Sequence, residues 1–294
     1  MSDRRRLLGS VNTIIPNVGL SSADGTAQPA KIESKTEPRI DGLRPFFLKT
    51  GIIENANGSS YLEVGNNIIE VSVYGPRPIR GSFIDRASFS VECKFLPFIS
   101  QPNEHLYNNT SISASSAANT TNQTNVNVNG RTGLTSIEHK ISSYIETSLL
   151  PSIVLEKYPK STIDVFVTII STDSSLGGSY SDTKMLSLVN WVLNASSVAL
   201  VDSGIEVKDV VTSGVAHLQN DVLVLDPTEI QEKDEGSVSC VASFMNLRND
   251  EIVGIWIEGD QTNLENSQVD HLLDGCNDMS KKVRANINSY FTTS

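Results

Sequence analysis

The stretch that decides the fold runs from Lys49 to Phe98, KTGIIENANGSSYLEVGNNIIEVSVYGPRPIRGSFIDRASFSVECKFLPF. Apolar and β-branched residues alternate with polar ones in Ser60–Val64 and Ile68–Tyr74, and Ala87–Phe98 alternates in the same way. We expect a four-stranded antiparallel meander with one apolar face. Such a face must be buried against helices or a second sheet.

Turn-forming pairs bound these runs: Asn57-Gly58, Gly65-Asn66-Asn67 and Gly75-Pro76. Asparagine and glycine adopt the positive φ that tight hairpins need, so both Gly58 and Gly65 are expected in that conformation.

The totals describe an ordinary globular chain that is strongly acidic. Its 294 residues are 38% hydrophobic and 19% charged, with a net charge of −11. That charge argues against a free-standing nucleic-acid binder, whose affinity would come from a basic surface. A local basic strip, Arg77, Arg80 and Arg86, remains compatible with nucleic acid inside a larger assembly.

The cysteines and histidines do not form a recognisable metal or redox motif. The cysteines, Cys93, Cys240 and Cys276, lie in apolar patterns without CxxC spacing and are expected to be buried thiols in a reducing compartment. Histidines are scattered, so neither a metal site nor a cofactor is expected. Apolar runs are too short for a membrane span, and we expect neither signal peptide nor anchor.

Two segments lack hydrophobic periodicity. Residues 1–38 read as a mobile arm whose Arg4, Arg5 and Arg6 either dock a partner or RNA, or belong to a solvated tail. Residues 101–133 are rich in Asn, Ser and Thr, which cannot offset their ordering entropy, and we expect a disordered insertion.

Helical and strand patterns alternate after the insertion. A capping box at Thr135–Glu138 opens a helix that Pro151 ends, and two further helices are expected over Thr183–Asp202 and Gln268–Phe291. Ile163–Ile170 reads as a strand buried on both faces, and hairpins are expected over 209–225 and 237–258. The fold class is therefore α+β, with antiparallel sheets covered by helices.

Residue chemistry alone gives two weak candidate sites. Gly177-Gly178-Ser179 precedes a helix, as in phosphate nests, but lacks the lysine and spacing of known motifs. Asp226 and Glu232 follow an apolar strand, where two carboxylates would suit magnesium or proton transfer. The alternative for these carboxylates is a solvated acidic turn capped by Asp226.

An ordered series of motifs resembles the RNase PH family, and specifically its eukaryotic exosome-ring members. The motifs are Arg39–Gly42, Gly51 with Asn57–Ser59, Val73–Arg77, Tyr158–Ser161, Ala199–Ile205 and Leu225–Thr228. Asp3–Gly9 and Ile79–Phe83 look most like one fungal ring component. The resemblance implies an RNase PH-like fold, also called ribosomal protein S5 domain 2-like, over residues 39–292, built as two similar halves.

The resemblance also implies partners and a place in the cell. Members of this kind form a six-subunit ring with other RNase PH-like subunits and OB-fold cap subunits. Single-stranded RNA passes through the channel of the ring to nucleases, in nucleus, nucleolus and cytoplasm. Arg77 and Arg80 correspond to the channel-facing loop, and Arg4, Arg5, Arg6 and Arg86 are weaker candidates for RNA contact.

Departures from the family pattern point to an inert member. Active members hold the attacking phosphate with an arginine whose place here falls near Val189, inside an apolar helix. They grip RNA with arginines beyond the first sheet, where this chain has no Lys or Arg between Lys94 and Arg131. We therefore expect a non-catalytic, structural subunit. The alternative is an active 3′ exoribonuclease that uses Asp226 and Glu232 in a composite site completed by a neighbouring subunit.

Overall fold

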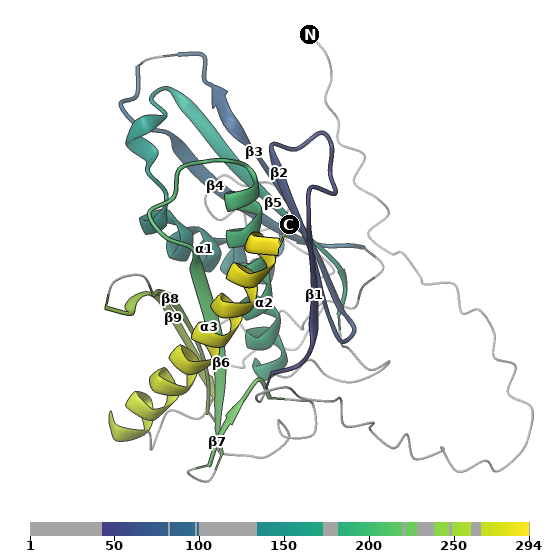
Figure 1. Ribbon diagram of the computed structural model, residues 1–294, viewed down its shortest axis with the longest axis vertical. Helices are drawn as coiled ribbons and strands as arrows, with labels where there is room; N and C mark the ends of the chain where they lie inside the picture. Colours follow the sequence, from purple (N-terminus) through teal and green to yellow (C-terminus); the bar gives the residue numbers. More distant parts are fainter. Residues whose placement is uncertain are drawn as a thin grey trace, which may run out of the picture. The chain divides into compact units, whose positions relative to one another are not determined.

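The computed structural model describes residues 43–81, 83–97, 99, 134–172, 182–219, 222–227, 238–246, 249–259 and 266–293 (Figure 1). The expected arm at 1–38 and insertion at 101–133 lie outside these ranges, as do Arg4–Arg6, Gly177–Ser179 and Glu232.

The first sheet contains five strands. They are β1 (Phe46–Thr50), β2 (Gly58–Val64), β3 (Asn67–Pro78), β4 (Ser88–Phe95) and β5 (Ser161–Ser171). Their order is β1-β2-β3-β5-β4, and only β4 and β5 run parallel.

The expected antiparallel meander is correct for β1–β3 and wrong for β4. Strand β5 lies between β3 and β4, where Val165 is opposite both Val73 and Val91. The connection from Ile79 to Ala87 is too long for a tight hairpin and leaves room for β5. The expectation that Ile163–Ile170 is buried on both faces is also wrong, because Asp164 is half-buried and Phe166 is 36% exposed.

The second sheet follows from the two expected hairpins. Its strands are β6 (Val211–Gln219), β7 (Val222–Leu225), β8 (Val238–Met245) and β9 (Glu251–Gly259), in the order β7-β6-β8-β9. Strands β6 and β8 are buried on both faces over nearly their whole length. Burial on both faces, which the sequence suggested for β5, is therefore found in β6 and β8.

Three α-helices, α1 (Ser136–Leu149), α2 (Asp182–Asp202) and α3 (Asn266–Thr293), and two short 3-10 helices, η2 (Leu150–Ser152) and η3 (Leu155–Lys157), complete the described part of the fold. Helix α2 contacts β2 and β3 of the first sheet as well as β6 and β8 of the second, and α3 packs on β6, β7 and β8. The elements therefore stack as sheet, helix, sheet, helix (Figure 1).

Helix α1 closes an edge of the first sheet. The expected capping box is confirmed: Thr135 Oγ1 accepts from Glu138 N at 3.3 Å, and Glu138 Oε2 accepts from Thr135 N at 2.8 Å. The same glutamate accepts from Phe95 N at 2.9 Å, and Ser142 Oγ accepts from Cys93 N at 2.8 Å. These two N–H groups belong to edge strand β4, so this edge offers fewer free donors to another strand.

Helix α2 is buried on all sides from Met185 to Leu200. Met185–Asp202 is long and apolar enough to cross a membrane, but 89% of it is buried inside the fold, as in a core helix. Close contact with β2 requires Gly58, because a Cβ there would lie 2.3 Å from Ser203 N. The expected positive φ is found at Gly65 and not at Gly58.

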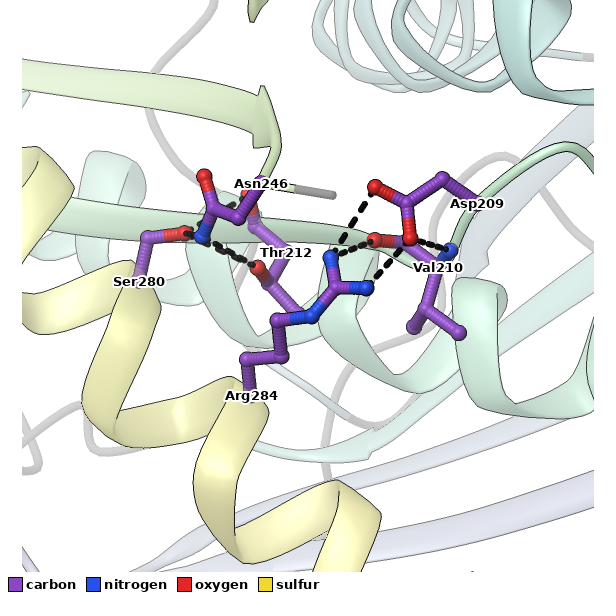
Figure 2. Close-up of polar contacts among 6 residues, drawn as sticks. All are labelled: Asp209, Val210, Thr212, Asn246, Ser280 and Arg284. Atoms are coloured by element: carbon purple, nitrogen blue, oxygen red, sulfur yellow. Dashed lines mark hydrogen bonds and ion pairs between the residues drawn. The ribbon is translucent and has the colours of Figure 1, made fainter. Parts of the chain in front are cut away.

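Helix α3 lies close to β6 and is fixed by polar contacts (Figure 2). A Cβ on Gly214 would lie 2.1 Å from Cys276 O, so glycine permits this approach. Arg284 forms an ion pair with Asp209 and donates to Val210 O at 3.1 Å. One turn earlier, Ser280 Oγ lies 2.8 Å from Thr212 Oγ1.

All cysteines are buried free thiols, as expected from the sequence. Burial raises the pKa of the Cys93 thiol. The pKa of Cys276 is raised first by its hydrogen bond with Cys240 and then by burial. These thiols pack as small apolar groups.

Candidate functional site

The carboxylate of Asp226 is fully buried in an ion pair with Arg44. Arg44 Nη2 lies 2.7 Å from Asp226 Oδ1, and Arg44 Nε lies 2.9 Å from Oδ2. The main-chain N–H of Arg44 also donates to Oδ2, at 3.1 Å. Both carboxylate oxygens thus accept hydrogen bonds from a single residue, in the bidentate geometry that binds arginine to carboxylate most strongly.

Neighbouring elements position the two partners. Asp226 directly follows β7 with a φ of 48°, and its N–H donates to Val215 O of β6 at 3.2 Å. Arg44 precedes β1 and is 5% exposed, and its Nη2 also donates to Ser187 Oγ of α2 at 2.8 Å. The ion pair therefore ties together the start of the first sheet, the central helix and the second sheet.

This geometry leaves Asp226 with a bracing role. A carboxylate that binds magnesium directs an oxygen at the ion, whereas both oxygens here face a guanidinium. Among the described residues, no three His, Cys, Asp or Glu side chains cluster in a way that would hold a metal ion. Glu232, the second carboxylate of the alternative site, lies outside the described residues.

Val189 lies inside α2 and is fully buried in the core. Leu186, Leu188 and Val192 beside it are also buried. Polar groups of this helix are directed into the fold: Asn194 Oδ1 accepts from Ser213 N at 3.0 Å. The middle of the helix therefore lacks the solvent access that a phosphate would need, and the cation described beside it, Arg44, is already paired with Asp226.

The basic residues expected at a channel lie where β3 leaves the first sheet. Arg77, Arg80 and Arg86 are all exposed. The guanidinium carbon of Arg77 is 4.5 Å from the ring centroid of Tyr74, which packs edge-on against Phe166 at 5.7 Å. Ring contact of this kind holds an arginine in place while its charge stays available to solvent.

Lys160 joins this group from a distant part of the sequence. Its main-chain oxygen accepts from Ile79 N at 3.0 Å, and its N–H donates to Ile84 O at 2.9 Å. Lys160 was not expected here, because the sequence does not show that β3 pairs with β5. We call Arg77, Arg80, Arg86 and Lys160 the basic end; no ion pair is found for them among the described residues.

A family profile matches the larger part of the described fold. The 3′ exoribonuclease family (RNase PH), domain 1, matches residues 42–206, which is more than half of the chain. The chain belongs to the RNase PH family. The expected fold is thereby confirmed.

Relatives and solved structures agree with this assignment. The chain is 26% identical to the exosome complex component MTR3 of Chaetomium thermophilum, over 88% of this chain and 87% of that protein. It is 29% identical to the exosome complex component Rrp41 of Pyrococcus horikoshii, over 75% of this chain and 76% of that protein. The similarity to a fungal exosome component that the sequence suggested is confirmed.

The fold is similar to that of two solved structures. Rice Rrp46 has a TM-score of 0.60 and 18% identity, and the match covers 84% of this chain and 95% of that one. A chain of the Archaeoglobus fulgidus exosome with RNA bound to the active site has a TM-score of 0.58 and 17% identity, covering 85% and 92%.

The resemblance to the RNase PH family implies two catalytic positions, and the structure describes the residues at both. The resemblance places the arginine that holds phosphate near Val189, which is buried in the helix core. The acidic position at Asp226 is neutralised by Arg44. Val189 and Asp226 were expected from the sequence, whereas Arg44 was not, because its only signal is a cation before the apolar start of β1.

Proposed function

We propose that this chain is a non-catalytic ring subunit of an RNA exosome. It joins other RNase PH-like subunits and OB-fold cap subunits, and single-stranded RNA passes through their common channel. The observation that carries the proposal is the Arg44–Asp226 ion pair beside the apolar α2.

Phosphorolysis makes electrostatic demands that these residues do not meet. An inorganic phosphate must approach a phosphodiester that is also negative, and fixed guanidinium groups must offset this repulsion. Val189 brings no charge, and the guanidinium of Arg44 is already neutralised by Asp226. The alternative of a composite site would require breaking this buried ion pair before Asp226 could bind a metal or move a proton.

The ring assignment is supported by the names of the relatives and by the fold. Both curated relatives reported above are exosome components, and each is covered over about three quarters of its length or more. The basic end supports an RNA path, with Arg77 and Arg80 as the principal contacts. Arg86 and Arg4–Arg6 are secondary candidates. A nuclear and nucleolar location, with a cytoplasmic fraction, follows from the same proposal.

Co-expression with other RNase PH-like exosome subunits tests the assembly. Native mass spectrometry of the purified material should show this chain at one copy per ring. A chain that stays monomeric at high concentration, with a thermal midpoint that its intended partners leave unchanged, would refute the ring assignment.

The RNA path is tested by charge reversal at Arg77 and Arg80. Replacing both with Glu should slow threading-dependent degradation by the whole complex and flatten its salt dependence. Unchanged threading would place these arginines away from the channel.

A further inference from the structure

The basic end carries an exposed aromatic ring. Phe83 is 74% exposed, more than any other large hydrophobic residue among those described, and neighbouring Ile84 is 41% exposed. Both lie in the connection between β3 and β4, between Arg80 and Arg86. The core does not bury this phenylalanine. Its ring would be covered only by a ligand or a partner.

The connection that presents Phe83 is anchored on both sides. Ile79 N donates to Lys160 O, Lys160 N donates to Ile84 O, and Ala87 N donates to Leu155 O, at distances of 2.9–3.0 Å. These contacts hold the loop against the turn before β5. Phe83 is therefore presented from a fixed base, which lowers the entropy cost of a contact.

Charge around the ring favours one kind of ligand. From Arg77 to Ala87 the chain carries Arg77, Arg80 and Arg86 against a single acidic residue, Asp85, and Lys160 adds another cation. The chain as a whole has a net charge of −11, so this concentration of positive charge is local. Proteins that hold single-stranded nucleic acid combine cations for the phosphates with aromatic rings for the bases.

We propose that Phe83 stacks on a base of single-stranded RNA while Arg80 and Lys160 contact the phosphates beside it. This inference rests on the proposed RNA path and adds a contact with the bases to a path otherwise defined by charge. A flat ring stacks on any base, so the contact slows and orients the strand without selecting its sequence.

Paired substitutions separate stacking from apolar packing. In the assembled complex, with its nucleases inactivated, Phe83→Leu keeps apolar bulk and loses the flat ring, whereas Phe83→Trp keeps the ring. The probe is a labelled oligouridylate, compared with an abasic chain of equal length. Because Phe83 is exposed, neither variant should change the thermal midpoint of the complex.

Stacking predicts a definite pattern of affinities. Phe83→Leu should weaken oligouridylate binding about tenfold, the scale of one lost stacking contact, and leave abasic binding unchanged. Phe83→Trp should bind like the native chain. Lys160→Gln should weaken both probes and reduce the salt slope by about 0.7, the value for one phosphate contact on a single strand.

Other results would overturn the stacking proposal. If both Phe83 variants bind oligouridylate like the native chain, Phe83 does not stack on RNA. If, in addition, Phe83→Leu and Phe83→Trp impair co-purification with the other subunits, the Phe83 side chain contacts a protein subunit instead of RNA. Should Arg77→Glu with Arg80→Glu still slow threading in that case, the RNA path stands and only the stacking contact fails. If those charge reversals also have no effect, the RNA path fails as well.

Discussion

The guanidinium of Arg44 holds the carboxylate of Asp226 through contacts of 2.7 and 2.9 Å, although the two residues lie 182 positions apart in the sequence. The pair is buried, and removal of one partner leaves the other charge without compensation. A carboxylate at this position could bind magnesium in an enzyme, whereas in this chain the Asp226 carboxylate stabilises the fold.

Substitution of one partner of this pair should be strongly destabilising. Asp226→Asn keeps the shape but leaves the Arg44 charge buried, so we expect the free energy of unfolding to fall by about 3–5 kcal/mol. Urea unfolding of the purified chain measures this loss. Adding magnesium should not change the unfolding midpoint of either protein.

The double variant Arg44→Met with Asp226→Asn is the matched control for that prediction, because Asn also tolerates the φ of 48° at this position. Removing both charges should restore most of the lost stability, because no uncompensated charge is then left in the core. A single variant as stable as the native chain, or a native midpoint that rises on adding magnesium, would contradict the bracing role.

Glu138 should stabilise two elements at once. Glu138→Ala removes the acceptor of Thr135 N at the start of α1 and of Phe95 N on edge strand β4. We expect a loss of about 2 kcal/mol in the free energy of unfolding, since a helix cap and a buried N–H are both left unsatisfied. Glu138→Gln keeps one acceptor oxygen in place of two, can serve only one of these N–H groups, and should lose less. Equal losses in the two variants would contradict a stabilising contribution from the hydrogen bond that Gln can keep.

Gly214 should not tolerate a side chain. In Gly214→Ala the new Cβ would meet the main chain of α3 at Cys276 O, which cannot rotate away, so we expect a loss of about 1–3 kcal/mol or more. Gly254→Ala is the control, because the two nearest atoms there are the hydroxyls of Ser148 and Ser243, which belong to side chains and not to main chain. Thermal unfolding compares the two. A milder effect at Gly214 than at Gly254 would contradict the close packing of α3 on β6.

The sequence was sufficient to predict elements whose signals are local. The alternation in β2 and β3, the capping box of α1 and the apolar stripe of α3 each depend on neighbouring residues, and all are found. Strand β4 was also located, but its partner was not. Alternation shows which face of a strand is buried and says nothing of which strand lies beside it.

Long-range contacts account for the remaining differences. Gly58 reads locally as a turn residue, yet its function is to let α2 approach β2. Polar Ser187 and Asn194 of α2 bind Arg44 and Ser213 inside the fold, which are contacts that no local pattern shows. For the same reason Arg44 and Lys160 were not predicted as site residues: each acquires its role from a segment far away in the sequence.

The turn between β8 and β9 should make stability depend on pH. Hydrogen bonds from Lys281 and Asn277 lower the pKa of Asp250. A lowered pKa in the folded state gives stability that is present above the unfolded pKa of about 3.9 and is lost as the pH falls through the folded value.

Asp250→Asn isolates this contribution. The native chain should be more stable than the variant at pH 7, and the difference should shrink below about pH 4 as the native carboxylate is protonated. Urea midpoints of both chains across this range give the measurement. A difference that stays constant down to acid pH would show that charge at Asp250 is not involved.

The most direct test of the non-catalytic interpretation is RNA decay by the assembled complex with every other nuclease inactivated. Phosphate and magnesium are titrated, and complexes carrying native chain, Glu232→Gln, or Asp226→Asn with Glu232→Gln are compared after native mass spectrometry has verified assembly. We predict no decay above background in any of them, because Val189 brings no charge and the Arg44 guanidinium, the cation described beside it, is already paired with Asp226. Phosphate- or magnesium-dependent decay by the native complex, abolished by these substitutions with assembly intact, would contradict the interpretation and favour the composite active site.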